Sequence, residues 1–165
     1  MIAVVQRARR AVVRAGAPLE EVGRIERGVV VLLAVERSDG PAQAAWMARK
    51  LAALRIFEDD QGRMNLPLAA VGGGVLLVSQ FTLAGDVREG NRPSFVRAAP
   101  PEEAEPLFRQ VGALLAEAGL PVAWGRFRTA MEVELVNDGP VTLVVQTPGP
   151  TGEAPGKEKE PVAGQ

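Results

Sequence analysis

The residues Ser79-Gln80-Phe81-Thr82 form the segment of this 165-residue chain that is best placed to do chemistry. They come directly after the apolar run at 75–78, so we expect them where a buried strand ends. At such a point, side chains and backbone N–H groups leave the sheet and can converge on a ligand. The alternative is a strand end that uses the same groups for its own turn hydrogen bonds.

Two other polar segments interrupt the apolar pattern. Residues 90–95 combine an arginine, a hydroxyl and an aromatic side chain, and residues 137–142 begin with Asn137-Asp138-Gly139-Pro140. Asp-Gly before a strand is ordinary turn chemistry. An X-Pro bond is cis in only about 5 to 6% of cases, so the sequence alone does not make Gly139–Pro140 cis. A structural loop is the alternative interpretation for both segments.

The absent residue types restrict the mechanism. The chain contains no histidine, cysteine or tyrosine. These side chains supply most bases that activate a nucleophile and most zinc ligands. Ser-His-Asp, Cys-His and zinc-hydroxide mechanisms are therefore excluded, and we expect no metal and no cofactor. An enzyme of this composition must rely on backbone donors, hydroxyls, carboxylates, arginine or groups of the substrate.

The charge balance limits the class of partner. The net charge is −1, which argues against a protein that coats nucleic acid regardless of its sequence. A selective RNA site stays open because the arginines gather in three groups. Each group is either a solvated surface or a local positive patch. The groups are Arg7, Arg9, Arg10 and Arg14; Arg88, Arg92 and Arg97; and Arg126 and Arg128.

The elements that must position these residues follow from the apolar pattern. β-branched runs predict strands at 2–7, 11–14 and 29–36, the last covered on both faces. Ser38-Asp39-Gly40-Pro41 then starts a helix with apolar residues at helical spacing. Residues 55–65 have the composition of an irregular excursion. Gly72-Gly73-Gly74 leads into a strand at 75–78, which excludes a Walker phosphate loop because that motif opens a helix.

The second half of the chain adds one helix and three strands. The helix is predicted from Pro100-Pro101 to Gly119, and Pro106 predicts a kink or a late start. Strands are expected at 122–127, 132–136 and 141–146. This order predicts an α/β fold, a mixed sandwich with both helices on one side of the sheet. The length allows one domain, residues 1–147, and the Pro/Gly-rich and charged stretch 148–165 predicts a flexible C-terminal tail. Neither a secretory signal nor a membrane-spanning run is present, so we expect a cytoplasmic protein.

Several of these segments together resemble the D-aminoacyl-tRNA deacylase family, over residues 1–147. Ala8, Arg128 and the tail depart from the family pattern. The matching motifs are Met1-Ile2-Ala3-Val4-Val5-Gln6-Arg7, Arg55-Ile56-Phe57 with Gly62-Arg63-Met64-Asn65, residues 79–86, Arg92-Pro93-Ser94-Phe95, Gly125-Arg126-Phe127 with Met131, and residues 135–142.

The resemblance implies a three-layer (β/β/α) sandwich and a homodimer whose active sites lie at the subunit interface. It places Ser79, Gln80, Phe81 and Thr82 around the 3′-terminal aminoacyl-adenosine of aminoacyl-tRNA. Gly139 and Pro140 of the partner subunit would enter the same pocket as a cis peptide. Their carbonyls would bind the amino group and exclude an L side chain, so D-aminoacyl-tRNA, and also glycyl-tRNA(Ala), would be hydrolysed. Arg7 would brace the inserted loop, and the pocket would be shaped by Phe127, Met131 and Ala99.

Two mechanisms fit the resemblance. Thr82 could act as a nucleophile, but a hydroxyl needs an adjacent base, and this chain has no histidine. The ribose hydroxyl next to the ester is already positioned, so RNA-assisted hydrolysis with oxyanion donors at Phe81 and Thr82 is the favoured mechanism. A small-molecule esterase and a non-catalytic RNA or protein interaction module are the rival functions.

Overall fold

The computed structural model describes residues 1–148. The predicted flexible tail lies outside these residues except for Pro148. Within these residues, two α-helices and eight strands are accompanied by two short 3-10 helices, η1 (Leu68–Val71) and η2 (Phe81–Ala84). The strands and helices are β1 (Ile2–Ala15), β2 (Glu20–Ile25), β3 (Gly28–Ala34), α1 (Pro41–Ala53), β4 (Arg55–Glu58), β5 (Met64–Pro67), β6 (Gly74–Ser79), α2 (Pro101–Glu117), β7 (Val122–Trp124) and β8 (Met131–Gln146).

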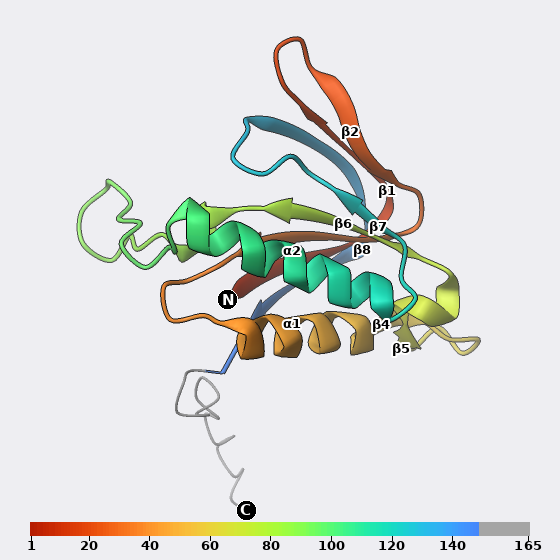
Figure 1. The fold of residues 1–165 in the computed structure, drawn as a ribbon. Helices are drawn as coiled ribbons and strands as arrows, with labels where there is room; N and C mark the ends of the chain where they lie inside the picture. The colour runs from red at the N-terminus through yellow and green to blue at the C-terminus, as the bar shows by residue number, and fades with distance from the viewer. Residues whose placement is uncertain (149–165) are drawn as a thin grey trace, which may run out of the picture.

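A six-stranded mixed sheet is the centre of the molecule. Its order is β2-β1-β3-β6-β7, and β8 pairs with the other edge of β1. Strand β1 is antiparallel to β2, β3 and β8, whereas β3, β6 and β7 run parallel. Both α-helices lie on one side of the strands and pack against each other (Figure 1). The predicted mixed α/β class with two helices on one side is confirmed.

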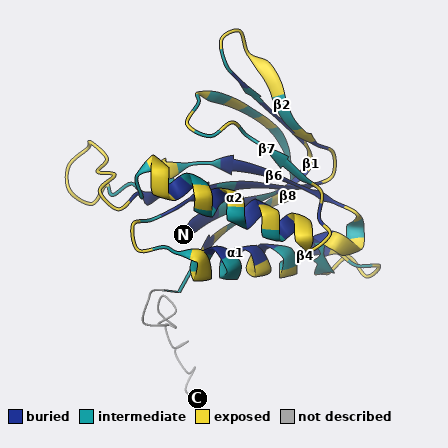
Figure 2. Ribbon diagram, in the orientation of Figure 1, coloured by how far each residue is buried: buried dark blue, intermediate teal, exposed yellow. Residues whose placement is uncertain are grey.

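Strand β3 is covered on both faces, as its continuous apolar sequence predicts. Val31 and Leu33 belong to the larger core between the sheet and the helices. Val30 belongs to a second core, which lies between the two halves of the sheet and includes Leu76 and Val78 of β6. The helices turn their buried residues toward the sheet and their exposed residues outward (Figure 2). Alternate residues of one strand therefore hold two layers in place.

The sheet curls until β2 approaches β7. Gly23 of β2 makes this approach possible, because a Cβ atom there would lie 2.6 Å from the carbonyl oxygen of Trp124 in β7. The curled sheet supplies two β layers and the helices supply the third, which is the predicted β/β/α arrangement. Neither helix within residues 1–148 has the length and hydropathy needed to cross a membrane.

Two strand breaks predicted from the sequence are wrong. Strand β1 runs without interruption from 2 to 15, because Ala8 is buried and pairs with Gly28 on one side and Asn137 on the other. The predicted strands at 132–136 and 141–146 are likewise one element, β8. Its pairing with β1 jumps from Ala8–Asn137 to Gln6–Thr142, so residues 138–141 bulge out of the ladder.

Three further predictions needed correction. Residues 55–67 form a β4–β5 hairpin and are not an irregular excursion. The turn is closed by the backbone N–H groups of Gln61 and Arg63, which donate to the carboxylate of Asp59. Helix α2 starts at Pro101, not late, because Pro106 is exposed and removes only a bond to Glu102 in the solvated first turn. Strand β7 ends at 124, three residues earlier than predicted.

Candidate active site

The segment Ser79-Gln80-Phe81-Thr82 lies where β6 turns sharply into η2, in agreement with the sequence prediction. The backbone N–H of Gln80 donates to the carbonyl oxygen of Leu33 at 2.9 Å, which is the last hydrogen bond between this segment and β3. The N–H of Leu83 then donates to the Gln80 carbonyl at 3.2 Å and closes the 3-10 turn. The first residues of such a turn, Phe81 and Thr82, have N–H groups without acceptors inside the turn.

A cavity of about 740 Å³ opens beside this strand end. Its lining joins segments that are far apart in the sequence: the end of β6, residues before α2, and residues between β7 and β8. The predicted site residues that line it are Ser79, Gln80, Phe81, Ala99, Phe127 and Met131. Tertiary structure therefore brings together most of the residues that the resemblance assigned to the pocket.

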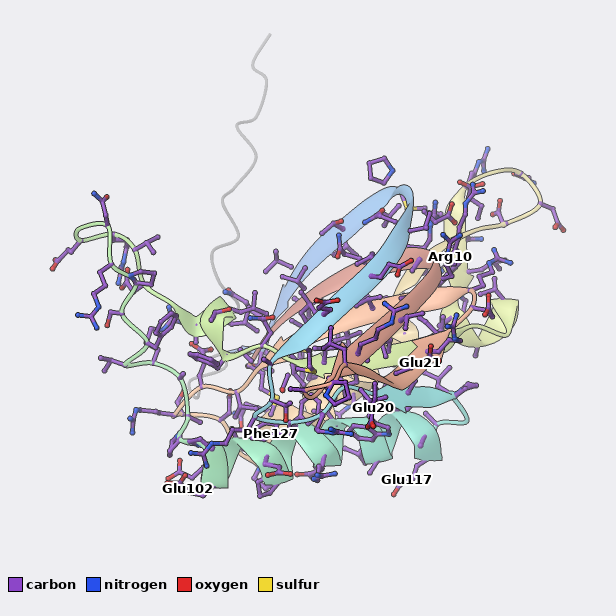
Figure 3. All side chains as sticks on the ribbon, turned by 90° about the horizontal axis from the view of Figure 1, so that it is seen from above. Arg10, Glu20, Glu21, Glu102, Glu117 and Phe127 are labelled. Atoms are coloured by element: carbon purple, nitrogen blue, oxygen red, sulfur yellow. The ribbon has the colours of Figure 1, made fainter. Side chains whose placement is uncertain are left out.

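Aromatic rings form much of the cavity wall. Phe108 of α2 lies 5.8 Å from Phe127 and 5.7 Å from Trp124, measured between ring centroids. Figure 3 shows Phe127 beside α2, in the chain that leads from β7 to β8. At the cavity mouth Phe81 is 57% exposed and meets Phe95 edge to face, with centroids 5.1 Å apart. Such a wall suits an apolar or aromatic group of a ligand.

Some lining residues were not among the predicted site residues. Phe108 appeared in the sequence as a core position of α2, and nothing in its spacing separates a core residue from a pocket residue. Phe95 belongs to the second polar segment, which offered a weak signal. Arg128 and Thr129 also line the cavity. They lie between Phe127 and Met131, which the resemblance had assigned to the pocket.

Thr82 lies beside the cavity, not in its lining. Its hydroxyl oxygen accepts a hydrogen bond from the side-chain amide of Gln80. An amide nitrogen donates hydrogen bonds and does not remove protons at neutral pH, so this contact does not activate the hydroxyl. The residues that the structure describes contain no cluster of acidic side chains able to hold a metal ion.

Gly139, Pro140 and Arg7 lie elsewhere in the chain. The Gly139–Pro140 peptide is cis, and both residues are exposed in the bulge of β8. Arg7 is 5% exposed and donates from Nε to the carbonyl oxygen of Asp138 at 2.9 Å. Gly139 and Arg7 border a separate pocket of about 330 Å³. Within one chain, the structure does not bring the predicted selectivity residues to the Ser79 cavity.

The loop between η2 and α2 forms one rim of the cavity and is anchored at Asp86. The backbones of Asp86 and Ser94 exchange two hydrogen bonds of 2.8 Å. The side-chain and backbone N–H groups of Arg88 donate to the Asp86 carboxylate and hold its pKa well below the ordinary value. This carboxylate is therefore a charged structural group and not a proton donor at neutral pH.

Known proteins resemble this chain over nearly its whole described length. A family model described as D-Tyr-tRNA(Tyr) deacylase matches residues 4–146. A D-aminoacyl-tRNA deacylase of Symbiobacterium thermophilum is 57% identical over 145 residues, which are 88% of this chain and 95% of that protein. A protein of the same name from Anaeromyxobacter dehalogenans is 56% identical over 147 residues, 89% of this chain and 97% of that protein.

Solved structures agree with the sequence matches. A c-Myc DNA unwinding element binding protein superposes with a TM-score of 0.83 at 37% identity and covers 90% of this chain and 100% of that one. A probable eukaryotic D-amino acid tRNA deacylase, only 17% identical, shares the fold with a TM-score of 0.73 over 87% of this chain and 97% of that one. Because the family model spans most of the chain and the relatives match it over nearly their full length, the chain belongs to the D-aminoacyl-tRNA deacylase family of hydrolases.

Proposed function

We propose that this protein hydrolyses the ester bond of D-aminoacyl-tRNA and releases free tRNA and the D-amino acid. The observation that carries the proposal is the cavity at the end of β6, where Ser79, Gln80 and Phe81 meet an apolar wall that includes Phe127 and Met131. A pocket with a few polar groups at one side suits an ester attached to a variable side chain. The relatives that match nearly the whole described chain carry the name of this activity. A cytoplasmic location is part of the proposal, because aminoacyl-tRNA is the proposed substrate.

The chiral selection in this proposal comes from Gly139 and Pro140 of the partner subunit, which enter the cavity. Both residues are exposed in one chain, and neither lines that chain's own cavity. Their carbonyls would bind the amino group of the substrate and leave no space for an L side chain. A site that accepts many D side chains must discriminate by excluding the wrong isomer, since no fitted side-chain pocket serves them all. Glycine has no side chain to exclude, so glycyl-tRNA(Ala) belongs to the proposed substrates.

A homodimer is part of the same proposal. Among the described strands, β8 pairs only with β1, so its other edge is open. Val144 on this strand is 67% exposed and is therefore accessible to another subunit. The bulge with Gly139 and Pro140 lies in the same strand. A dimer contact along β8 would bring the bulge of one subunit toward the cavity of the other.

The proposed mechanism is direct hydrolysis assisted by the substrate. The ribose hydroxyl next to the ester orients a water molecule, whose oxygen attacks the ester carbonyl carbon. The backbone N–H groups of Phe81 and Thr82 donate to the oxyanion, a contribution of about 3 to 4 kcal/mol per donor in hydrolases. The bond from the carbonyl carbon to the ribose oxygen then breaks, and that oxygen takes the proton that the attacking water gives up, so a free ribose hydroxyl and the carboxyl group of the amino acid are formed. The absence of histidine, cysteine and tyrosine supports this route over an activated side-chain nucleophile.

Three substrates test the proposal together. D-tyrosyl-tRNA, L-tyrosyl-tRNA and glycyl-tRNA(Ala) are incubated with the protein in the presence of a chelator, and release of the amino acid is followed. Rapid release of D-tyrosine and glycine with the L-ester intact is the expected result. Equal hydrolysis of both tyrosyl esters would replace the proposal with a general esterase. Binding of the tRNA without release of any amino acid would replace it with an RNA interaction module.

A further inference from the structure

Arg128 is the one charged side chain in the lining of the Ser79 cavity, as far as the described residues show. Every other lining residue is apolar or an uncharged polar residue such as Ser79, Gln80 or Thr129. The Arg128 residue itself is exposed, so its guanidinium group remains hydrated. A single cation at an otherwise uncharged site selects for an anionic group on the ligand.

The guanidinium group of Arg128 also has no carboxylate partner within residues 1–148. Three other arginines near the cavity or next to it in the sequence do have such a partner. Arg97 pairs with Glu36, Arg88 pairs with Asp86, and Arg126 lies 4.0 Å from Glu20. The charge of Arg128 is therefore not neutralised inside the described part of the chain and is available to a ligand.

The backbone at Arg128 is strained. Its φ is +55°, and among residues 1–148 it is the one residue other than glycine with a left-handed backbone. Such a conformation costs energy for a residue with a Cβ atom and persists only where neighbouring contacts impose it. Here Phe127 packs on Phe108, and the Thr129 hydroxyl donates to the Phe127 carbonyl at 3.2 Å. The turn is thus held on both sides, and it keeps Arg128 at the cavity.

We propose that Arg128 binds the phosphodiester group that joins the terminal adenosine of the substrate to the preceding nucleotide. This inference rests on the proposed function. The amino group of an aminoacyl ester is cationic, so an arginine beside it would weaken binding. The phosphodiester is the anion nearest to the reacting ester, and a guanidinium group matches its geometry with two parallel hydrogen bonds. Arg128 would then be a positioning residue that holds the end of the tRNA while the ester enters the cavity.

Kinetics with two substrates test this role. We compare D-tyrosyl-tRNA with D-tyrosyl-adenosine, which has the same ester but no phosphate. Arg128→Asn removes the charge, and asparagine tolerates a left-handed backbone. For D-tyrosyl-tRNA we expect KM to rise on the order of tenfold with kcat nearly unchanged, a modest loss because the guanidinium group is exposed and water replaces part of the lost contact. For D-tyrosyl-adenosine we expect no change, and Arg128→Lys should recover part of the lost affinity.

Arg126→Asn is the matched control. It removes one positive charge two residues from Arg128, but the side chain of Arg126 does not line the cavity. We expect its KM for both substrates to stay within about twofold of the wild type, within the range of a surface substitution. Equal effects of Arg126→Asn and Arg128→Asn would overturn the proposal, since they would reflect overall charge. An equal loss on both substrates by Arg128→Asn would also overturn it.

A binding measurement distinguishes failure of the Arg128 proposal from failure of the proposed function. The affinity of the trinucleotide CCA is measured over a series of salt concentrations. Log affinity falls as log salt rises, and for the wild type this slope should be more negative than for Arg128→Asn by about 0.7, the value for one single-strand phosphate contact. Hydrolysis without this difference overturns the role of Arg128 alone. The slope difference without hydrolysis supports Arg128 and overturns the proposed function.

Discussion

The guanidinium group of Arg7 in β1 donates from Nε to the carbonyl oxygen of Asp138, one residue before Gly139 in the bulge of β8, at 2.9 Å. The same group donates from Nη1 to the carbonyl oxygen of Ile56 in β4 at 2.7 Å. One buried side chain therefore links three elements. It replaces the strand-to-strand hydrogen bonds that the bulge interrupts, and it holds the exposed Gly139–Pro140 peptide in one position.

Replacing Arg7 should destabilise the fold and weaken chiral selection together. Arg7→Ala leaves the carbonyls of Asp138 and Ile56 without these donors, at an expected cost of about 3 kcal/mol in the free energy of unfolding. Arg7→Lys should cost less, but one ammonium group cannot reproduce the fork of a guanidinium group. Urea unfolding measures the loss. Release of L-tyrosine from L-tyrosyl-tRNA should rise in both variants.

Arg9→Ala is the control for Arg7. Arg9 is exposed, and its side chain forms one ion pair within residues 1–148, with the Asp138 carboxylate at 3.0 Å, so its removal should cost less than about 1 kcal/mol. A chiral preference unchanged in a folded Arg7→Lys variant would contradict the bracing role of Arg7.

Thr82→Ala should keep most of the hydrolytic activity. The Thr82 hydroxyl accepts a hydrogen bond from the Gln80 amide and lies outside the lining of the cavity. The proposed oxyanion donor is the backbone N–H of the residue, which alanine retains. We expect kcat to fall by less than about tenfold, as for loss of a single neutral hydrogen bond. A loss above a thousandfold, or an acyl-enzyme detected by mass spectrometry, would make Thr82 the nucleophile.

Gly112→Ala should destabilise the protein although alanine favours helices. A Cβ atom at Gly112 would lie 2.0 Å from the Trp124 ring, which packs on Phe108 in the cavity wall. The higher helix propensity of alanine contributes about 1 kcal/mol to stability. Overpacking against the Trp124 ring costs about 1 to 3 kcal/mol, and the 2.0 Å approach places the cost at the upper end of this range. Chemical unfolding gives the net change, and D-tyrosyl-tRNA should bind more weakly.

Ala113→Gly in the same helix turn reports the helix propensity alone, because Ala113 is exposed. It should cost about 1 kcal/mol and leave substrate binding unchanged. A stabilised Gly112→Ala variant would mean that the Trp124 ring moves freely, and that the wall of the cavity is not closely packed.

Asp86→Asn should lower the melting temperature at neutral pH and have little effect in acid. Hydrogen bonds from Arg88 hold the pKa of Asp86 below its ordinary value. A lowered pKa in the folded state stabilises the protein above the unfolded-state pKa of about 4, and this stability is lost as the pH falls through the folded-state value. The difference in melting temperature between wild type and variant should therefore shrink from pH 7 to pH 2. Salt should shrink it at neutral pH, because the pair is exposed.

Asp60→Asn is the comparison, since Asp60 is exposed and accepts no side-chain hydrogen bond among the described residues. Its effect on the melting temperature should be small at every pH. A pH-independent difference for Asp86→Asn would mean that the carboxylate charge is not what anchors the loop.

Much of this protein was predictable from local sequence. The apolar run of β3 predicted a strand buried on both faces, and the structure divides its residues between two cores. Helical spacing predicted the buried faces of α1 and α2. The polar segment after residue 78 predicted the place where the chain leaves the sheet beside the cavity. The missing histidine, cysteine and tyrosine excluded whole classes of mechanism before any fold was known.

Tertiary structure decided the remaining features, because they depend on partners distant in the chain. Whether 137–141 interrupts a strand or bulges from one depends on its pairing with β1, and the β4–β5 hairpin depends on hydrogen bonds at Asp59. In the sequence, Phe108 has the spacing of a core residue of α2. Its place in the cavity wall follows from the packing of the 125–131 segment beside it. The left-handed backbone that keeps Arg128 at the cavity could not be predicted from the sequence. The backbone preference of an arginine opposes this conformation, and packing around Phe127 maintains it.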